Sequence, residues 1–387
     1  MRKHKKILLI VSIVAVFTGV CMMLGAYLTL QRNADNAVAG LEFEEKTLNI
    51  TDPITSIHIS TINSSIELLP SPDGIFRIVC DDSEKLYHQV SVTKPASGAQ
   101  LNIHQRNDWP WYEMLYGLFR KDNLSLQVYL PESEYVLLHA DSSSGDITVA
   151  PDFRFQTVYT YTASGNTRMT ALSAENLNVC SVSGDLILHK IEAAQDVYLE
   201  SISGFMQIEA LTATNITAHG SCGSTVLQDV SSGTLRAAAV SGDIHILGGR
   251  FSDSSCFETG SGSIEIVDSS CGEQALQTVS GAVTLQNVSG SSLNAGTSSG
   301  TVLIEKALYS GGLLCRSTSG EIMLAGTDAG ALELFSSSGD ISGNLLSSKN
   351  FITETSSGYV DIPRSDETAG TCHISTVSGN INIAITP

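Results

Sequence analysis

The segment Ser181-Val-Ser-Gly-Asp-Leu-Ile-Leu188 decides the fold of this chain, because close variants of it recur from Asp141 to the C-terminus. Each copy centres on a glycine, usually preceded by serine, and successive glycines lie 19 to 21 residues apart. Such self-similarity is the sequence mark of a solenoid, in which each repeat buries its apolar face against its neighbours. The thirteen glycines of the repeat are Gly145, Gly165, Gly184, Gly204, Gly223, Gly242, Gly262, Gly281, Gly300, Gly320, Gly339, Gly358 and Gly379.

Apolar and polar residues alternate on both sides of each glycine. Around Gly184, Leu186 and Leu188 follow the glycine by two and four residues, and Leu177 and Val179 precede it by seven and five. A period of two predicts two short strands per repeat, each with one buried face. We expect the glycine to form a corner whose backbone conformation only glycine tolerates. The small residue three positions before it indicates a crowded, inward-facing corner.

The predicted fold is therefore all-β: a single-strand-stacked parallel β-solenoid with about 19 to 20 residues per rung and 13 rungs. At about 4.8 Å between stacked strands, the rod is on the order of 60 Å long. No 3.6-residue pattern survives through these segments, which argues against a helical repeat.

The N-terminal residues have the pattern of a membrane anchor. Residues 7–30 hold no charged side chain over 24 positions, enough for a helix to cross the roughly 30 Å of a bilayer core. The basic segment 1–6 precedes them, so the positive-inside bias predicts a cytoplasmic N-terminus and an extracytoplasmic remainder. A cleaved signal peptide is the alternative, since Ala37 and Ala39 form a peptidase pattern. The length of the apolar run favours an uncleaved anchor.

Five segments are expected along the chain. A cytoplasmic basic tail (1–6) precedes a transmembrane helix (7–30) and a linker (31–40). Residues 41–135 contain strand patterns without the regular glycine spacing, and they predict an N-terminal β section that caps the rod. Residues 136–387 form the repeat β-solenoid.

Charge and cysteine content exclude several classes of protein. The chain carries 40 acidic against 21 basic residues, for a formal charge of −19, which makes nucleic acid an unsuitable partner. Seven cysteines lie beyond the apolar stretch, without any C-x-x-C spacing, so neither a zinc ribbon nor a thioredoxin-like pair is indicated. Cys315 and Cys372 fall in inward columns three rungs apart, too far for a disulfide.

Two constellations resemble catalytic sites. Gly296–Gly300 matches G-x-S-x-G around Ser298, and Asp340 and His373 follow in hydrolase order. The motif coincides with the recurring corner, which favours a structural role. Glu321 and Asp340 fall on adjacent rungs and could form a cation site or an acid pair, but an acidic residue after the glycine is also typical of a turn.

No metal centre is predicted from histidine. The five histidines of the repeat face outward in the predicted strands, and no two of them share a position on neighbouring rungs. They are His139, His189, His219, His245 and His373. We therefore expect no catalytic residue, no cofactor and no metal ligand.

The segment Trp109–Phe119 holds both tryptophans of the chain. Trp109, Trp111, Tyr112 and Phe119 are the candidate partner-binding residues, since exposed aromatic clusters suit contacts with a protein, a glycan or the outer membrane surface. The alternative is a short helix or loop whose aromatic side chains cover the open end of the rod.

The order of these features resembles a known family. An apolar anchor and irregular strands precede LQVYLPESEYVLLHADSSSGDITV at Leu126–Val149, and rungs of the SVSGDLIL type follow. This order is similar to that of the bacterial candidate-adhesin family, formally a domain of unknown function, over roughly residues 48–387. The resemblance implies a β-solenoid at the cell surface and brings no activity, cofactor or catalytic residue.

The sequence thus predicts a non-catalytic, membrane-anchored, extracytoplasmic protein for adhesion, scaffolding or envelope-associated binding. Its expected partners are the membrane and a cell-surface or extracellular protein or glycan. The alternative is a polysaccharide-active β-helix enzyme. We find no outward column in which acids, bases and aromatic residues accumulate over consecutive rungs, and a glycan-cleaving groove would need one.

The topology can be tested with tags at both ends. Protease added to intact cells should remove a C-terminal tag and spare an N-terminal one, because the anchor places only the C-terminus outside. Protection of the C-terminal tag would contradict this topology, and release of a soluble chain beginning near Gly40 would show signal cleavage.

Overall fold

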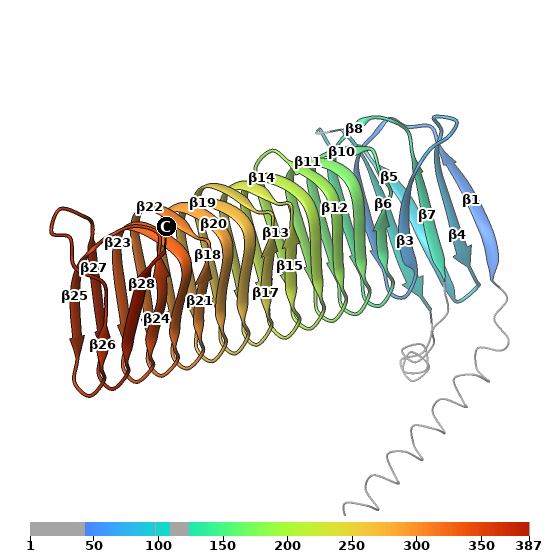
Figure 1. The fold of residues 1–387 in the computed structure, drawn as a ribbon. Helices are drawn as coiled ribbons and strands as arrows, with labels where there is room; N and C mark the ends of the chain where they lie inside the picture. The colour runs from blue at the N-terminus through green and yellow to red at the C-terminus, as the bar shows by residue number, and fades with distance from the viewer. Residues whose placement is uncertain (1–42, 97, 109–123, 387) are drawn as a thin grey trace, which may run out of the picture.

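A computed structural model of the protein describes residues 43–96, 98–108 and 124–386. They form an all-β parallel β-solenoid, in which each of the thirteen corner glycines stacks on the corner of a neighbouring turn. Figure 1 shows the turns stacked into a rod, with the first strands at one end and β25–β28 at the other. The described residues contain no helix that is long and apolar enough to cross a membrane. The predicted transmembrane helix at 7–30 lies outside them.

Each turn supplies one strand before its corner and one after it, so the rod has two long parallel sheets. We call these the first sheet and the second sheet. The longest strands, such as β11, bend and take part in both sheets. The N-terminal strands are β1 (Glu44–Ile50), β2 (Ile54–Thr61), β3 (Ser65–Pro70), β4 (Phe76–Asp82), β5 (Leu86–Thr93), β6 (Ala99–Asn107) and β7 (Ser125–Leu130).

The strands of the regular repeat follow in order along the rod. They are β8 (Glu134–Ser142), β9 (Ile147–Val149), β10 (Phe153–Thr162), β11 (Thr167–Ser181), β12 (Leu186–Ala193), β13 (Asp196–Ser201), β14 (Met206–Gly220), β15 (Thr225–Gln228), β16 (Ser231–Ala239), β17 (Ile244–Leu247), β18 (Arg250–Thr259), β19 (Ile264–Thr278), β20 (Val283–Thr297), β21 (Val302–Glu305), β22 (Leu308–Ser317), β23 (Ile322–Ser336), β24 (Ile341–Leu345), β25 (Asn350–Thr355), β26 (Val360–Asp361), β27 (Thr371–Thr376) and β28 (Ile381–Ile385).

The core is one continuous apolar column along the rod axis. Most residues predicted to face inward are buried in the structure, including Leu177, Val179 and Ile264, whereas Val360 on the end turn is 42% exposed. The neighbour of Ile264, Glu265, faces outward and contacts His245 of the preceding turn at 2.9 Å. The strand phase predicted from the alternation is therefore confirmed.

The corner glycines are needed for close approach and not for an unusual backbone. None of them has a positive φ. A Cβ atom built on the glycine of each turn would instead lie only 1.7–2.1 Å from the carbonyl oxygen of the corner residue in the neighbouring turn. The expected reason for glycine was therefore wrong, because it is the stacked backbone of the next turn that leaves no room for a side chain.

A buried hydroxyl ladder supports these corners. In the turn of Gly281, the Thr278 hydroxyl accepts a hydrogen bond from the glycine N–H at 3.1 Å and donates one to the Gly262 carbonyl at 2.9 Å. Serine or threonine repeats this arrangement in most turns, as Ser201 does for Gly204 at 2.9 Å. The crowded, inward-facing position predicted three residues before the glycine is therefore a hydrogen-bonding position as well.

A second corner, not predicted from the sequence, lies six or seven residues after most of the corner glycines. The backbone there adopts the left-handed conformation, with φ between 48° and 71° at eight residues other than glycine. Four of them, Ala171, Lys190, Ala210 and Lys306, are types for which this conformation costs about 1–2 kcal/mol. The tertiary stacking therefore imposes this bend against the local preference.

At both ends of the rod, the order of turns differs from the order of the sequence. The β2–β3 turn lies between the β6–β7 turn and the β8–β9 turn, with parallel pairing on both sides. At the other end, β27 and β28 are inserted between β23–β24 and β25–β26. Gly379 accordingly stacks on Gly339, and Gly358 stacks on Gly379.

The N-terminal end is closed by antiparallel strands. β5 pairs with β6 at the edge of the first sheet, and β4 and β1 extend the second sheet beyond β7. The section predicted as an irregular cap thus contains two full parallel turns as well as these covering strands. Its turns escaped the repeat pattern because Ser64 stands at the corner position of the β2–β3 turn, where Gly145 stacks against its carbonyl.

Corner packing can be tested with a pair of glycine substitutions. A Cβ at Gly281 would lie 1.8 Å from the Gly262 carbonyl oxygen, so Gly281→Ala should lower the free energy of unfolding by about 1–3 kcal/mol through overpacking. Gly312, in β22, has no heavy atom within 4 Å of such a Cβ. Gly312→Ala should change stability by no more than about 0.5 kcal/mol. Equal losses in urea denaturation would contradict this account of the corner.

Candidate functional site

One outer face of the first sheet, near its N-terminal end, gathers aromatic, histidine and acidic side chains. Two outward positions per turn, separated by one inward residue, supply them. Parallel in-register pairing brings these positions together, with His58 opposite His139 and Tyr159 opposite His139. We call this surface the aromatic–histidine strip. It comprises His58, His139, Asp141, Tyr159, Tyr161, Tyr198, Glu200 and His219, on β2, β8, β10, β13 and β14.

The rings of the strip form two groups. His58 and His139 are stacked, with ring centroids 5.3 Å apart and planes inclined by 20°, and His139 lies 4.7 Å from Tyr159. Further along, Tyr198 and His219 lie 5.8 Å apart. The side chain of Tyr161 remains 38% exposed. The strip therefore offers ring faces and edges to a ligand across several turns.

Carboxylates lie among these rings. The Asp141 carboxylate contacts His139 Nε2 at 2.9 Å, and the Tyr198 hydroxyl donates a hydrogen bond to Glu200 at 3.0 Å. Asp141, His139, Tyr159 and Tyr161 line a shallow depression of about 520 Å³, together with serine and threonine hydroxyls of the corner. Apolar ring faces thus border a hollow with several hydrogen-bonding groups.

Local electrostatics shift the pKa values of one histidine and one tyrosine of the strip. Burial lowers the pKa of His58, and the neighbouring His139 lowers it further. Burial and the Glu200 carboxylate raise the pKa of Tyr198 to about 12. At neutral pH, His58 is therefore an uncharged imidazole and Tyr198 a protonated hydrogen-bond donor.

A comparison with family models places the chain. The Toastrack DUF4097 model matches residues 54–267 and 195–384. The chain belongs to this family. The match confirms the resemblance drawn from the sequence, and it spans the β2–β3 turn as well as the regular repeat.

Solved structures and curated proteins add little to this assignment. A candidate cell adhesion protein of Clostridium sporogenes is 7% identical, with 89% of this chain and 100% of that chain covered and a TM-score of 0.21. A candidate adhesin of Bacteroides fragilis is 10% identical, with 89% and 97% covered and a TM-score of 0.20. Neither likeness bears on function at these scores. No curated protein matches the sequence significantly.

The strip of this Toastrack protein corrects one sequence-based conclusion. The sequence showed no outward column of acids, bases and aromatic residues, whereas the structure shows one. His58 was overlooked because its turn lacks the glycine and is inserted out of sequence order. The signal was present in the alternation of Ile57, Ile59 and Ile66 around Ser64, which matches the repeat with serine in the glycine position.

The hydrolase-like pattern noted in the sequence, and interpreted there as structural, is not assembled into a site. Ser298 lies on the exposed corner of the Gly300 turn, and Asp340 follows the corner two turns further along. His373 lies on β27, one turn beyond Asp340. Each turn adds about 4.8 Å, so the three groups lie beyond hydrogen-bonding distance of one another.

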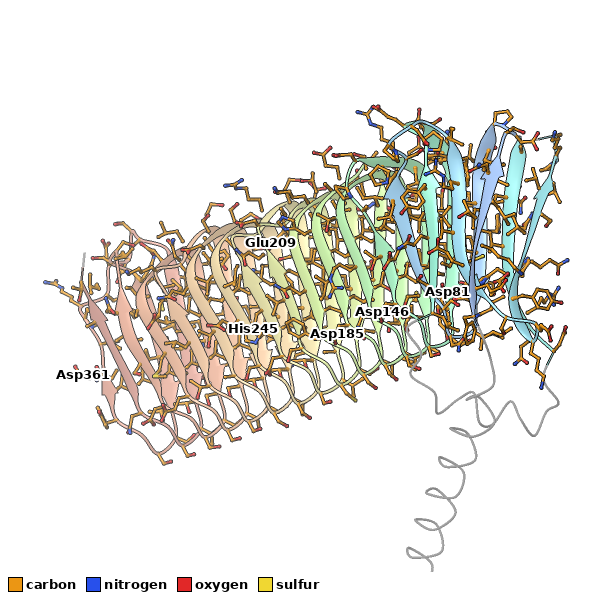
Figure 2. All side chains as sticks on the ribbon, turned by 90° about the vertical axis from the view of Figure 1, so that its right-hand side faces the viewer. Asp81, Asp146, Asp185, Glu209, His245 and Asp361 are labelled. Atoms are coloured by element: carbon orange, nitrogen blue, oxygen red, sulfur yellow. The ribbon has the colours of Figure 1, made fainter. Side chains whose placement is uncertain are left out.

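The acidic residues that follow the corner glycines have structural roles. Asp146 and Asp185 lie along one edge of the rod (Figure 2), and each accepts a backbone N–H from the next turn at 2.8 Å. Asp340 similarly accepts the Asn380 N–H at 2.7 Å. Glu321 and Asp340 do lie on adjacent turns, as predicted, but they belong to no group of potential metal ligands among the described residues.

One prediction about the cysteines changes in detail. Cys315 and Cys372 are buried in the core, as expected. They are two turns apart and not three, because the β27–β28 turn is inserted next to β23–β24. All cysteines among the described residues are free. The predicted partner-binding residues Trp109, Trp111, Tyr112 and Phe119 lie outside the described residues.

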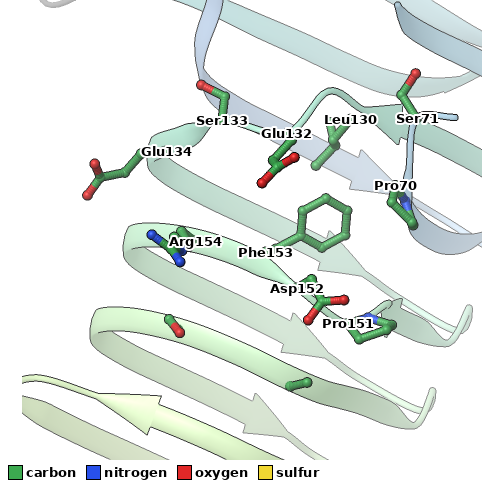
Figure 3. A pocket seen from close by; sticks show the side chains of 12 residues that line it. Pro70, Ser71, Leu130, Glu132, Ser133, Glu134, Pro151, Asp152, Phe153 and Arg154 are labelled. Carbon is green, nitrogen blue, oxygen red and sulfur yellow. The ribbon is translucent and has the colours of Figure 1, made fainter. Parts of the chain in front are cut away.

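Another hollow lies elsewhere. It has a volume of about 810 Å³ and is lined by Glu132, Glu134, Asp152 and Arg154 above the buried ring of Phe153 (Figure 3). It lies at the second corner, where the first turns leave the second sheet. Most of its charges are acidic, and it lacks the stacked rings that distinguish the strip.

The neutral state of His58 predicts a pH dependence. Because its folded pKa is lowered, the unfolded chain binds a proton at a higher pH, and the free energy of unfolding should fall as the pH drops below about 6.5. His58→Gln should reduce this acid sensitivity in urea denaturation at neutral and mildly acidic pH. The control is His245→Gln, whose imidazole pairs with Glu265 on a distant turn. An unchanged pH profile in His58→Gln would contradict the assignment.

Proposed function

We propose that this Toastrack protein is an extracytoplasmic adhesion module, held to the membrane by residues 7–30, and that it binds without catalysis. Its ligand-binding surface is the aromatic–histidine strip. The ligand is a glycan of the cell envelope or the extracellular matrix, without net negative charge. The excess of acidic over basic residues opposes binding to polyanionic polymers.

The arrangement of rings and carboxylates on the strip carries this proposal. Sugars present flat C–H faces and a ring of hydroxyls, so they suit a surface that combines aromatic faces with hydrogen-bonding groups. The stack of His58, His139 and Tyr159 supplies the faces, and Asp141 and Glu200 supply acceptors. Because these groups come from successive turns, a linear polymer can contact several of them at once.

The spacing of the acids favours binding over hydrolysis. Glycosidases place two carboxyl groups about 5–9.5 Å apart. Asp141 and Glu200 face the same side but are separated by Tyr161 and Cys180, which makes three strand steps or about 14 Å. The alternative of a polysaccharide-active enzyme therefore lacks a suitably spaced acid pair on this surface.

Weak contacts at each turn become useful through repetition. Many proteins anchored in one membrane can engage a polymer at several points, and the combined strength exceeds that of a single contact by orders of magnitude.

Substitutions on the strip test this function. The double variant Tyr159→Ala with Tyr198→Ala should weaken attachment of expressing cells to a glycan array or matrix at least about tenfold, since each ring contact contributes about 0.5–1.5 kcal/mol. The control is Tyr359→Ala, which removes a tyrosine that is 60% exposed on the last turn. Equal attachment in both variants would overturn the strip as the binding surface.

The same assay separates the other candidates. Ser298→Ala, and Glu321→Gln with Asp340→Asn, should leave attachment unchanged. The triple variant Trp109→Ala, Trp111→Ala and Phe119→Ala tests the binding role predicted from the sequence for that segment. Hydrolysis of an arrayed glycan that disappears in Asp141→Asn would replace adhesion by the enzymatic alternative.

A further inference from the structure

A compact group of potential metal ligands lies in the N-terminal end of the rod, away from the strip. Cys80 and Asp82 point inward from β4, and His88 comes from the neighbouring β5. One ligand atom from each lies within 4.8 Å of the others, and all three residues are buried. No other group of three such residues occurs in the part of the chain that the structure describes.

The contacts of Asp82 organise this group. Its carboxylate accepts the His88 backbone N–H at 2.9 Å and faces His88 Nδ1 at 2.7 Å. It also contacts the ammonium group of Lys46, on β1, at 3.2 Å. Three strands therefore meet at this one buried carboxylate, and the Cys80 thiol lies beside it.

His88 gives an independent indication that the site takes a ligand. Its side chain is fully buried, with 0% exposure. Its Nε2 atom has no hydrogen-bond partner. Buried polar atoms are nearly always paired, and an unpaired one destabilises the empty site. A buried imidazole beside a thiol and a carboxylate is the usual protein environment of a borderline-soft metal ion.

We propose that Cys80, Asp82 and His88 bind a zinc-like divalent metal ion that clamps the N-terminal end of the solenoid. The ligand set of one sulfur, one oxygen and one nitrogen suits zinc, with water in the fourth position. Binding deprotonates the Cys80 thiol, so one proton is released to solvent for each metal ion bound. The oxidation state of the metal ion does not change.

The geometry requires only small movements. Zinc bonds of about 2.0–2.3 Å hold neighbouring ligand atoms about 3.3–3.8 Å apart in a tetrahedron. The ligand atoms here, all within 4.8 Å of one another, need to shift by about 1 Å or less. Lys46 must leave the carboxylate, and it can do so because its side chain is 52% exposed and reaches solvent.

The location explains what such an ion would do. β4 belongs to the second sheet, and β5 is the last strand of the first sheet at this end. A metal ion held by both strands would tie the edges of the two sheets together over the end of the core. Because β5 pairs with only one strand among the described residues, β6, this edge gains most from an additional link.

Cobalt provides a direct probe. The purified full-length chain, reduced and stripped of metal with a chelator, should bind one Co²⁺ per chain and develop a thiolate-to-cobalt charge-transfer band. Zinc should abolish the band and raise the thermal unfolding temperature. Cys80→Ser should lose the band, and His88→Gln should weaken cobalt binding at least about tenfold. Cys222→Ser, which removes an exposed thiol elsewhere, should retain both band and affinity.

The outcomes are decisive even for variants that fold poorly. Circular dichroism identifies variants that do not fold. If the variants do not fold, cobalt binding by the unmodified chain alone tests the proposal. If that chain develops no thiolate band, or if a folded Cys80→Ser keeps the same band and affinity, the site is not a metal site. The cluster would then be a structural contact centred on Asp82. Attachment through the strip is measured separately, so the two proposals fail independently.

Discussion

The stacking of corner glycines is the constraint on which the rest of this structure depends. The glycine of each turn presses against the corner carbonyl of its neighbour, at a distance where a Cβ would lie 1.7–2.1 Å from the oxygen. This contact fixes both the spacing and the phase of successive turns. Because the phase is fixed, a residue at a given distance from one glycine lies opposite the residue at the same distance from the next. Core columns, hydroxyl ladders and surface columns all follow from that alignment.

The two ends of the rod, where a turn has a neighbour on one side only, are built in the same way. At each end, a turn is inserted between two others that are neighbours in the sequence. Removing the inserted turn would therefore break two stacked interfaces. Gln105 replaces the missing corner contacts at the N-terminal end, where its side-chain oxygen accepts the Ile62 N–H at 2.7 Å. At the other end, the buried Lys349 ammonium contacts Asp328 at 2.6 Å.

The aromatic–histidine strip shows how a repeating scaffold accumulates surface chemistry. Outward positions are free of packing constraints, so each turn can contribute a different polar or aromatic side chain to the same column. The fixed interval between turns suits extended ligands with many weak contacts. It suits catalysis less well, because the distance between acids in one column, such as Asp141 and Glu200, is limited to whole numbers of strand steps. The same regularity that produces the surface thus favours recognition over chemistry.

The sequence alone determined the solenoid, its two strands per turn and the inward phase of residues such as Ile264, because each depends on local alternation and a fixed period. It could not determine the order of the end turns or the left-handed second corner at Ala171 and Lys190. The place of His58 in the aromatic–histidine strip and the Cys80–Asp82–His88 cluster were equally hidden. These features depend on which segments stack against each other, and His58 meets His139 only because β2 is inserted beside β8. Periodicity specifies how a turn is built, whereas the burial of exposed strand edges decides where each end turn is placed.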